Sequence, residues 1–234
     1  MLERMTDVVK HLLIINVIAY FLTLPNHAIF GYDLAVHYPM SPLFRPYQLV
    51  THMFMHGSIM HLFFNMYGLV MLGPALEYRL GSARFLIYYF VSGFGALLLH
   101  FGVSYYQISA LAGSLNSVDV AKVFEEGAGI IASGRNYVGR LGELNDRLNG
   151  GMLGASGAIF GILAGFGALF PRVELRLLFP PITLTAKWFV LIYAGIELYL
   201  GLSGMQSGVA HFAHVGGALF GFLLIRYWRR TTIM

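Results

Sequence analysis

The sequence contains no cysteine, and only 11% of its residues are charged, against roughly 25% in ordinary soluble domains. The lack of cysteine excludes disulfides, thiol nucleophiles and thiolate metal sites, although it says nothing about the compartment. The shortage of charge excludes a soluble globular protein, because so few charged residues cannot cover the surface of a chain this long. With 57% hydrophobic residues, the composition indicates a polytopic membrane protein.

The basic residues outnumber the acidic ones, 15 to 11, but they are scattered along the chain instead of forming a stripe. A nucleic-acid partner is therefore not expected, and the lipid bilayer is the expected environment. The first ten residues lack a small-residue cleavage signal, so the first apolar span is expected to be retained as an anchor.

Six apolar segments approach the length of about 20 residues that a membrane-spanning helix needs. They are Val8–Leu24, His61–Tyr78, Phe85–Tyr105, Ser156–Phe170, Ala186–Leu202 and Val209–Trp228. The fourth is short, so its start must be buried in protein or face a water-filled cavity. The sequence predicts an all-α fold with six transmembrane helices in a single membrane domain over residues 1–234.

A long polar segment, Gln107–Gly151, separates the third span from the fourth. Within it, Ala121–Ile131 and Val138–Leu148 have weak amphipathic periodicity and are predicted to be helices. We expect this segment to be an extramembrane insert on the outer side.

The distribution of positive charge predicts the orientation. If the N-terminus is inside, the outer segments carry Arg45 and four basic residues of the insert, and the inner segments carry the rest. The inner residues are Arg4, Lys10, Arg79, Arg84, Arg172, Arg176, Lys187, Arg226, Arg229 and Arg230. Both termini are therefore expected in the cytoplasm, with the protein in a bacterial inner (cell) membrane.

A glycine-flanked serine begins the fourth span, in Gly154-Ala155-Ser156-Gly157. The first turn of a helix has unpaired N–H groups and the positive end of the helix dipole, so it favours developing negative charge. Ser156 is therefore a candidate nucleophile if a base lies nearby.

The sixth span supplies two candidate bases, His211 and His214, one helical turn apart. Small-residue stripes let helices approach closely, and the fourth and sixth spans both have one. The stripes are Gly157, Gly161 and Gly165 in the fourth span, and Gly217 and Gly221 in the sixth. If these stripes meet, a histidine of the sixth span lies beside Ser156.

The start of the second span carries His61 and Asn65, which share a helix face because they are four residues apart. Both side chains can donate hydrogen bonds, as an oxyanion hole requires. The alternative is a polar pair that binds neighbouring helices.

Five histidines suggest a metal site, and a lone acid lies within the fifth span. The histidines are His52, His56, His61, His211 and His214. The sequence has no H-E-x-x-H motif and no acid next to any of these histidines, so no metal is expected. Glu197, in the fifth span, fits a polar contact better than a role in chemistry.

Together these residues resemble the rhomboid family of intramembrane serine proteases, over about Ser41–Trp228 apart from the insert. The matching motifs are His56-x4-His61-x3-Asn65, Gly73-x3-Glu77-x3-Gly81-x3-Phe85, Gly154-Ala155-Ser156-Gly157 and Ala213-His214-x2-Gly217-x3-Gly221. The resemblance implies a six-helix rhomboid-like bundle with a long outer insert between its third and fourth helices. It also implies a serine endopeptidase without cofactors that cleaves single-span transmembrane proteins near the outer membrane face.

The family pattern implies roles for individual residues. Ser156 would be the nucleophile and His214 its base, in a dyad without a carboxylate partner. Oxyanion stabilisation would come from His61, Asn65 and the turn at Gly154, with the backbone N–H of Ser156. The active-site rim would include His56, Phe160 and His211, and the loop Met205–Ala210 would cover the site. Phe160 stands where a tyrosine often supports the histidine, so a hydroxyl is lost there.

Two other classes remain open at this point. A catalytically weak or silent rhomboid-like protein would bind membrane clients, but such proteins tend to lack the serine or the histidine. A small transporter would use buried histidine and glutamate to relay protons, but the sequence has no discernible inverted repeat.

Overall fold

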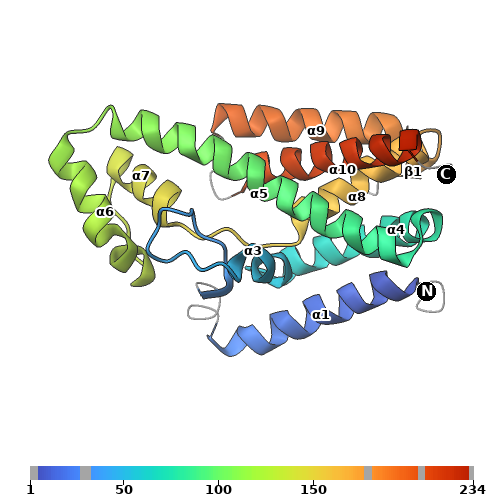
Figure 1. Cartoon of the computed structure of the whole chain (residues 1–234), viewed down its shortest axis with the longest axis horizontal. Coiled ribbons are helices and arrows are strands. Elements are labelled where there is room, and N and C mark those ends of the chain that lie inside the picture. The colour runs from blue at the N-terminus through green and yellow to red at the C-terminus, as the bar shows by residue number, and fades with distance from the viewer. Residues whose placement is uncertain (1–4, 27–32, 177–180, 205–208, 232–234) are drawn as a thin grey trace.

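A computed structural model of the chain describes residues 5–26, 33–176, 181–204 and 209–231, which are mostly helical (Figure 1). Its longer helices are α1 (Asp7–Thr23), α4 (Ile59–Leu80), α5 (Ser82–Ala112), α6 (Ser117–Ala132), α7 (Gly139–Asn149), α8 (Ser156–Leu169), α9 (Ala186–Ser203) and α10 (His211–Thr231). The short elements are η2 (Leu24–Asn26), α3 (Gln48–Thr51), η3 (His52–Phe54) and an antiparallel pair of strands, β1 (Glu174–Arg176) and β2 (Thr183–Thr185).

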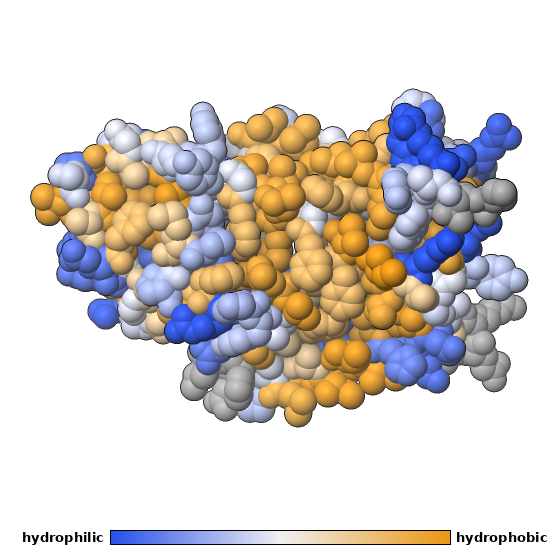
Figure 2. All heavy atoms as spheres, in the orientation of Figure 1, coloured by the Kyte–Doolittle hydropathy of each residue, from blue (hydrophilic) through white to orange (hydrophobic). Residues whose placement is uncertain are grey.

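Each predicted span coincides with a helix, and five have nearly the predicted bounds. The exception is α5, which continues past Tyr105 to Ala112, into the segment predicted to be the insert. Among the described residues, α4, α5 and α9 are long and apolar enough to cross a membrane, and α8 is a shorter apolar helix. A broad hydrophobic band crosses the middle of the molecule, with hydrophilic residues concentrated toward its ends (Figure 2). Because α1 and α10 do not meet the same length and hydropathy criteria, the six-span arrangement remains a prediction.

The helices that matter for function pack around α10, which contacts α5, α8 and α9. In turn α8 contacts α4 and α5, and α1 packs along α4. Figure 1 shows that α1 begins and α10 ends at the same end of the molecule, whereas α6 and α7 lie at the opposite end. The start of α8 is therefore enclosed by neighbouring helices.

The predicted glycine stripes meet, and they bring α8 and α10 close together. A Cβ added to Gly217 would overlap the carbonyl oxygen of Gly157, and one added to Gly221 would lie 2.9 Å from the Cα of Gly161. The hydroxyl of Tyr88, from α5, donates to the carbonyl oxygen of Gly161 at 2.5 Å. No larger side chain fits on this face without separating the two helices.

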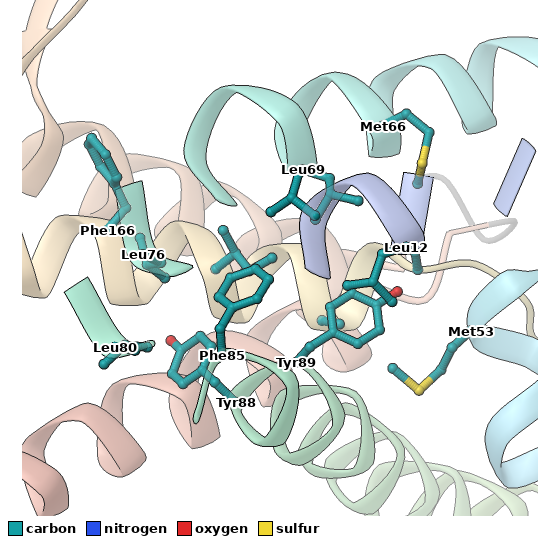
Figure 3. Close-up of a cluster of buried hydrophobic side chains, with 14 of the residues drawn as sticks. Leu12, Met53, Met66, Leu69, Leu76, Leu80, Phe85, Tyr88, Tyr89 and Phe166 are labelled. Atoms are coloured by element: carbon teal, nitrogen blue, oxygen red, sulfur yellow. The ribbon is translucent and has the colours of Figure 1, made fainter. Parts of the chain in front are cut away.

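The main hydrophobic core lies between α1, α4, α5 and α8 (Figure 3). Its fully buried members include Leu69, Leu76, Phe85, Tyr88 and Tyr89.

Glu77, from the second family motif, lies at the edge of this core near the end of α4. Its carboxylate accepts the backbone N–H groups of Val8 and Val9 at 3.0 and 2.9 Å. It also accepts the Ser82 hydroxyl at 2.7 Å. Since the first N–H groups of a helix lack partners within it, Glu77 caps α1 and joins it to α4 and α5.

The segment between α5 and α8 packs with the end of α5 and with Tyr38 in a second hydrophobic cluster. Both stretches predicted as amphipathic helices are helical, as parts of α6 and α7. The cluster contains Tyr38, Ile108, Leu111, Val123, Leu144 and Leu148. At the last residue of α7, the carbonyl oxygen and the side chain of Asn149 bind His37 Nδ1 and the Ser41 hydroxyl. Beyond α7, Met152 pairs with Val36. These contacts fix the chain that leads into α8.

Candidate active site

A glycine with a positive φ sets the turn before Ser156. Gly154 has φ +129°, a conformation that side-chain-bearing residues rarely adopt, and its N–H donates to the carbonyl oxygen of His52 at 2.9 Å. A Cβ at Gly154 would lie 2.8 Å from two atoms of the His61 ring. The glycine therefore lets the His61 ring lie against the turn that presents Ser156 at the start of α8.

Ser156 and His214 are hydrogen-bonded. The hydroxyl oxygen of Ser156 lies 2.8 Å from Nε2 of His214. The close packing of α8 on α10 through the two glycine stripes brings these residues, 58 positions apart in sequence, to this distance. Nucleophile and base candidates thus meet in the geometry that proton transfer requires.

The face of the His214 ring is covered by Phe160, one turn after the serine. The two rings are stacked, with centroids 4.2 Å apart and an interplanar angle of 4°. Tyr193 of α9 packs on Phe160, with a centroid separation of 5.0 Å. The aromatic contact expected at Phe160 is therefore present, and it restricts rotation of the imidazole.

The expectation that His214 has no carboxylate partner is wrong. Oε2 of Glu197 lies 2.9 Å from Nδ1 of His214 and 2.7 Å from Nδ1 of His211. Each of the three side chains is at most 12% exposed. A buried carboxylate is costly unless hydrogen-bonded, so it takes the nearest donors, and here these are the two imidazoles. Of the rim residues, His211 thus contacts Glu197.

Glu197 belongs to the site, although the sequence predicts only a polar contact for it. A signal existed, because an acid within an apolar span is costly and marks a functional position. The connection between α9 and α10 is short, so the two helices are antiparallel neighbours, and Glu197 and His214 lie at similar distances from it. These two observations make Glu197 a candidate partner for a histidine of α10, but they do not fix which face of α9 turns toward α10.

The two predicted oxyanion donors, His61 and Asn65, lie one turn apart on α4, and the Asn65 amide is already hydrogen-bonded within the helix. Asn65 Nδ2 donates to the carbonyl oxygen of its own helix, at His61, over 3.0 Å. An amide nitrogen has two N–H groups, so one remains for another acceptor. The structure brings His61 beside Gly154, whereas the roles of His61 and Asn65 toward an oxyanion stay predictions.

His56 precedes α4, and its ring lies against that of His61. The two rings make an edge contact with centroids 5.0 Å apart. Burial lowers the pKa of His56 to about 4, and the nearby His61 adds to this effect. Burial likewise lowers the pKa of His52 to about 4. Both rings are therefore uncharged near pH 7, and the His56 ring packs against that of His61 in α4.

No acid stands next to these histidines in the sequence, but in the structure Glu197 lies beside two of them. Glu197, His211 and His214 present ligand atoms within 4.8 Å of one another, a grouping that could hold a metal ion. A metal on Nδ1 of His214 would compete with the hydrogen bond to Glu197. The predicted covering loop, Met205–Ala210, lies mostly outside the described residues.

The fold and this site define a helical membrane protein with a serine–histidine pair at the start of a short apolar helix. The rhomboid domain family matches residues 44–231, more than half of the chain. The chain therefore belongs to the rhomboid family, whose members are generally intramembrane serine proteases.

Three relatives illustrate the range of similarity. Rhomboid protease AarA of Providencia stuartii is 30% identical over 175 residues, which cover 74% of this chain and 52% of the relative. The putative rhomboid protease YdcA of Bacillus subtilis is 26% identical over 229 residues, 94% of this chain and 88% of the relative. The mitochondrial Rhomboid protein 1 of Saccharomyces cerevisiae is 28% identical over 175 residues, which cover 75% of this chain and 40% of the relative. The chain thus spans about half the length of AarA.

Proposed function

We propose that this protein is an intramembrane serine endopeptidase that cleaves single-span transmembrane proteins near the outer membrane face. The observation that carries the proposal is the 2.8 Å contact between Ser156 Oγ and His214 Nε2. Family membership supports the same reaction class, because rhomboid proteins are generally serine proteases of transmembrane substrates.

The reaction would follow acyl-transfer chemistry. Ser156 Oγ attacks the scissile carbonyl carbon while its proton moves to His214 Nε2. The tetrahedral oxyanion is stabilised by the Ser156 backbone N–H, His61 and Asn65. When the C–N bond breaks, His214 returns the proton to the leaving amine, and a water molecule then hydrolyses the acyl-enzyme.

The length of α8 supports cleavage below the membrane surface. Its 14 residues extend about 21 Å at 1.5 Å per residue, whereas the hydrocarbon core is about 30 Å thick. If α8 ends at the inner interface, its first residue lies about 9 Å below the outer one. A substrate helix must unwind locally to expose a carbonyl there, so small or helix-breaking residues near its outer end are favoured.

The six-span arrangement belongs to the same proposal, with α1, α4, α5, α8, α9 and α10 as spans. Basic residues at or between the helix ends on one side, including Arg79, Arg84 and Arg172, support cytoplasmic termini. We propose a bacterial inner membrane as the location. The 31 residues of α5 extend about 46 Å, so this helix is long enough to hold α6 and α7 outside the bilayer.

The test is cleavage of a single-span substrate by the full chain in proteoliposomes. Ser156→Ala and His214→Ala should each lower kcat at least about 10³-fold, because nucleophile and base act as a unit. The exposed residues Ser133 and His11 supply matched controls, Ser133→Ala and His11→Ala, which should keep wild-type rates. A fluorophosphonate probe should label wild type at Ser156. Cleavage by Ser156→Ala at the wild-type rate would refute the proposal.

A further inference from the structure

We propose that Glu197 is a positioning residue for His214, so that the serine and histidine work with a third, carboxylate member. This inference rests on the proposed function, in which His214 is the base for Ser156. It departs from the expected dyad because the chain itself provides the carboxylate, from α9, at 2.9 Å from Nδ1 of His214.

Glu197 determines the tautomer of His214. A carboxylate only accepts hydrogen bonds, so Nδ1 of an imidazole beside it must carry a proton. In neutral His214, Nε2 is then unprotonated and can accept the Ser156 proton across the 2.8 Å contact. The opposite tautomer would place an N–H against the serine hydroxyl and remove the base.

Glu197 is itself held by His211. The same oxygen, Oε2, is 2.7 Å from Nδ1 of His211, a residue only 5% exposed. One turn after Glu197, Gly201 lies against His211, where an added Cβ would be 3.2 Å from the Cβ of His211. The His211 contact and the close approach of α9 to α10 therefore fix the carboxylate, and the carboxylate fixes His214.

Glu197 also stabilises the charge that forms during the reaction. When His214 takes the Ser156 proton it becomes an imidazolium, and Glu197 lies at its far nitrogen. The carboxylate stabilises this cation without accepting the proton, because the Nδ1 proton stays on the ring. Phe160 covers the face of the ring and has no hydroxyl, so among the described residues Glu197 is the polar partner of Nδ1.

The test compares Glu197→Gln with wild type in the same proteoliposome assay, with kcat and KM measured separately. Glutamine has the same shape but no charge, so kcat should fall about 10²- to 10⁴-fold, with KM within about twofold. Glu197→Asp keeps the charge on a shorter side chain and should recover part of kcat. A merely structural glutamate would change the melting temperature and the yield, not kcat of the folded enzyme.

Glu77→Gln is the matched control. Glu77 is also a buried glutamate, but it caps α1 and lies away from Ser156. This variant should lower the melting temperature and leave kcat unchanged. If Glu197→Gln does not accumulate as folded protein, Glu197→Asp alone carries the test, with an expected fall in kcat of at least tenfold.

The possible results distinguish a failure of the Glu197 role from a failure of the proposed protease activity. If Ser156→Ala is inactive while folded Glu197→Gln and Glu197→Asp keep wild-type kcat, the positioning role is overturned and the serine protease stands. If Ser156→Ala still cleaves, the proposed function fails whatever Glu197 does. If EDTA abolishes wild-type cleavage and zinc restores it, the Glu197, His211 and His214 cluster is a metal site and the positioning role is again overturned.

Discussion

At the scale of single residues, the geometry of the site depends on His214 being held from several directions. Ser156 contacts Nε2, Glu197 contacts Nδ1, and Phe160 covers the ring face. These three groups come from α8 and α9, whereas His214 is on α10. A base held in this way loses little freedom on reaching the transition state, because its tautomer and orientation are set beforehand.

Gly154 is the residue of the turn that tolerates substitution least. In Gly154→Ala, the alanine would have to adopt a φ of +129°, and its Cβ would lie 2.8 Å from the His61 ring. Backbone strain of this kind costs about 1–3 kcal/mol, and the turn would shift Ser156 relative to His214. We expect kcat to fall at least about tenfold, since displacements of about 1 Å can cost about 10²-fold.

The matched control for this substitution is Gly57→Ala, near the same site. Its added Cβ meets only Leu153, at an ordinary 3.7 Å. Fluorophosphonate labelling rates of the two variants check the prediction. Equal labelling rates for Gly154→Ala and Gly57→Ala would show that the turn conformation does not govern the reactivity of Ser156.

At the scale of helices, the close packing of α8 on α10 determines the distance between Ser156 and His214. Gly217→Ala would force a Cβ into the carbonyl oxygen of Gly157, so the two helices must separate. We expect kcat to fall at least about tenfold, because the proton-transfer contact lengthens. We also expect a lower melting temperature, because the packing of α8 on α10 is lost.

Gly102→Ala on α5 is the control, because an added Cβ there meets nothing within 4 Å. It should leave both kcat and melting temperature near wild type. Thermal unfolding and substrate cleavage measured on the same preparations check the pair. A wild-type kcat for Gly217→Ala would mean that the glycine face is not what brings His214 to Ser156.

The sequence predicted the helices well because apolar length and glycine spacing are local properties. The stripes at Gly157 and Gly217 even indicated which two helices would meet. It did not predict the contact between Glu197 and His214, which depends on how α9 rotates toward α10, and a membrane helix has apolar residues on all sides to obscure its facing side. Nor did it predict that Glu77 caps α1, because this cap joins Glu77 to Val8, 69 positions earlier in the sequence.

At the scale of the whole molecule, the two ends of the helix bundle differ in chemistry. Arg79 lies in the last turn of α4, and Arg229 and Arg230 lie in the last turn of α10. Basic side chains at helix C-termini complement the helix dipole, and they agree with the proposal that this end is cytoplasmic. The opposite end carries α6 and α7, where α7 packs on α5 and α6 packs on α7 (Figure 1).

The helices α6 and α7 belong to a segment whose chain returns directly to Ser156, so their removal tests whether they guide substrates or support the core. We propose replacing Asp119–Arg147 with a short Gly-Ser linker that retains Asn149 and its contacts to His37 and Ser41. Because α6 and α7 form a hydrophobic cluster separate from the main core, we expect Ser156 labelling to persist. The ratio of kcat/KM between two substrates that differ outside the membrane should change severalfold.

Asn149→Ala, which keeps both helices but loses the Ser41 bond, is the control. Loss of all labelling after the deletion would show instead that α6 and α7 support the turn at Ser156.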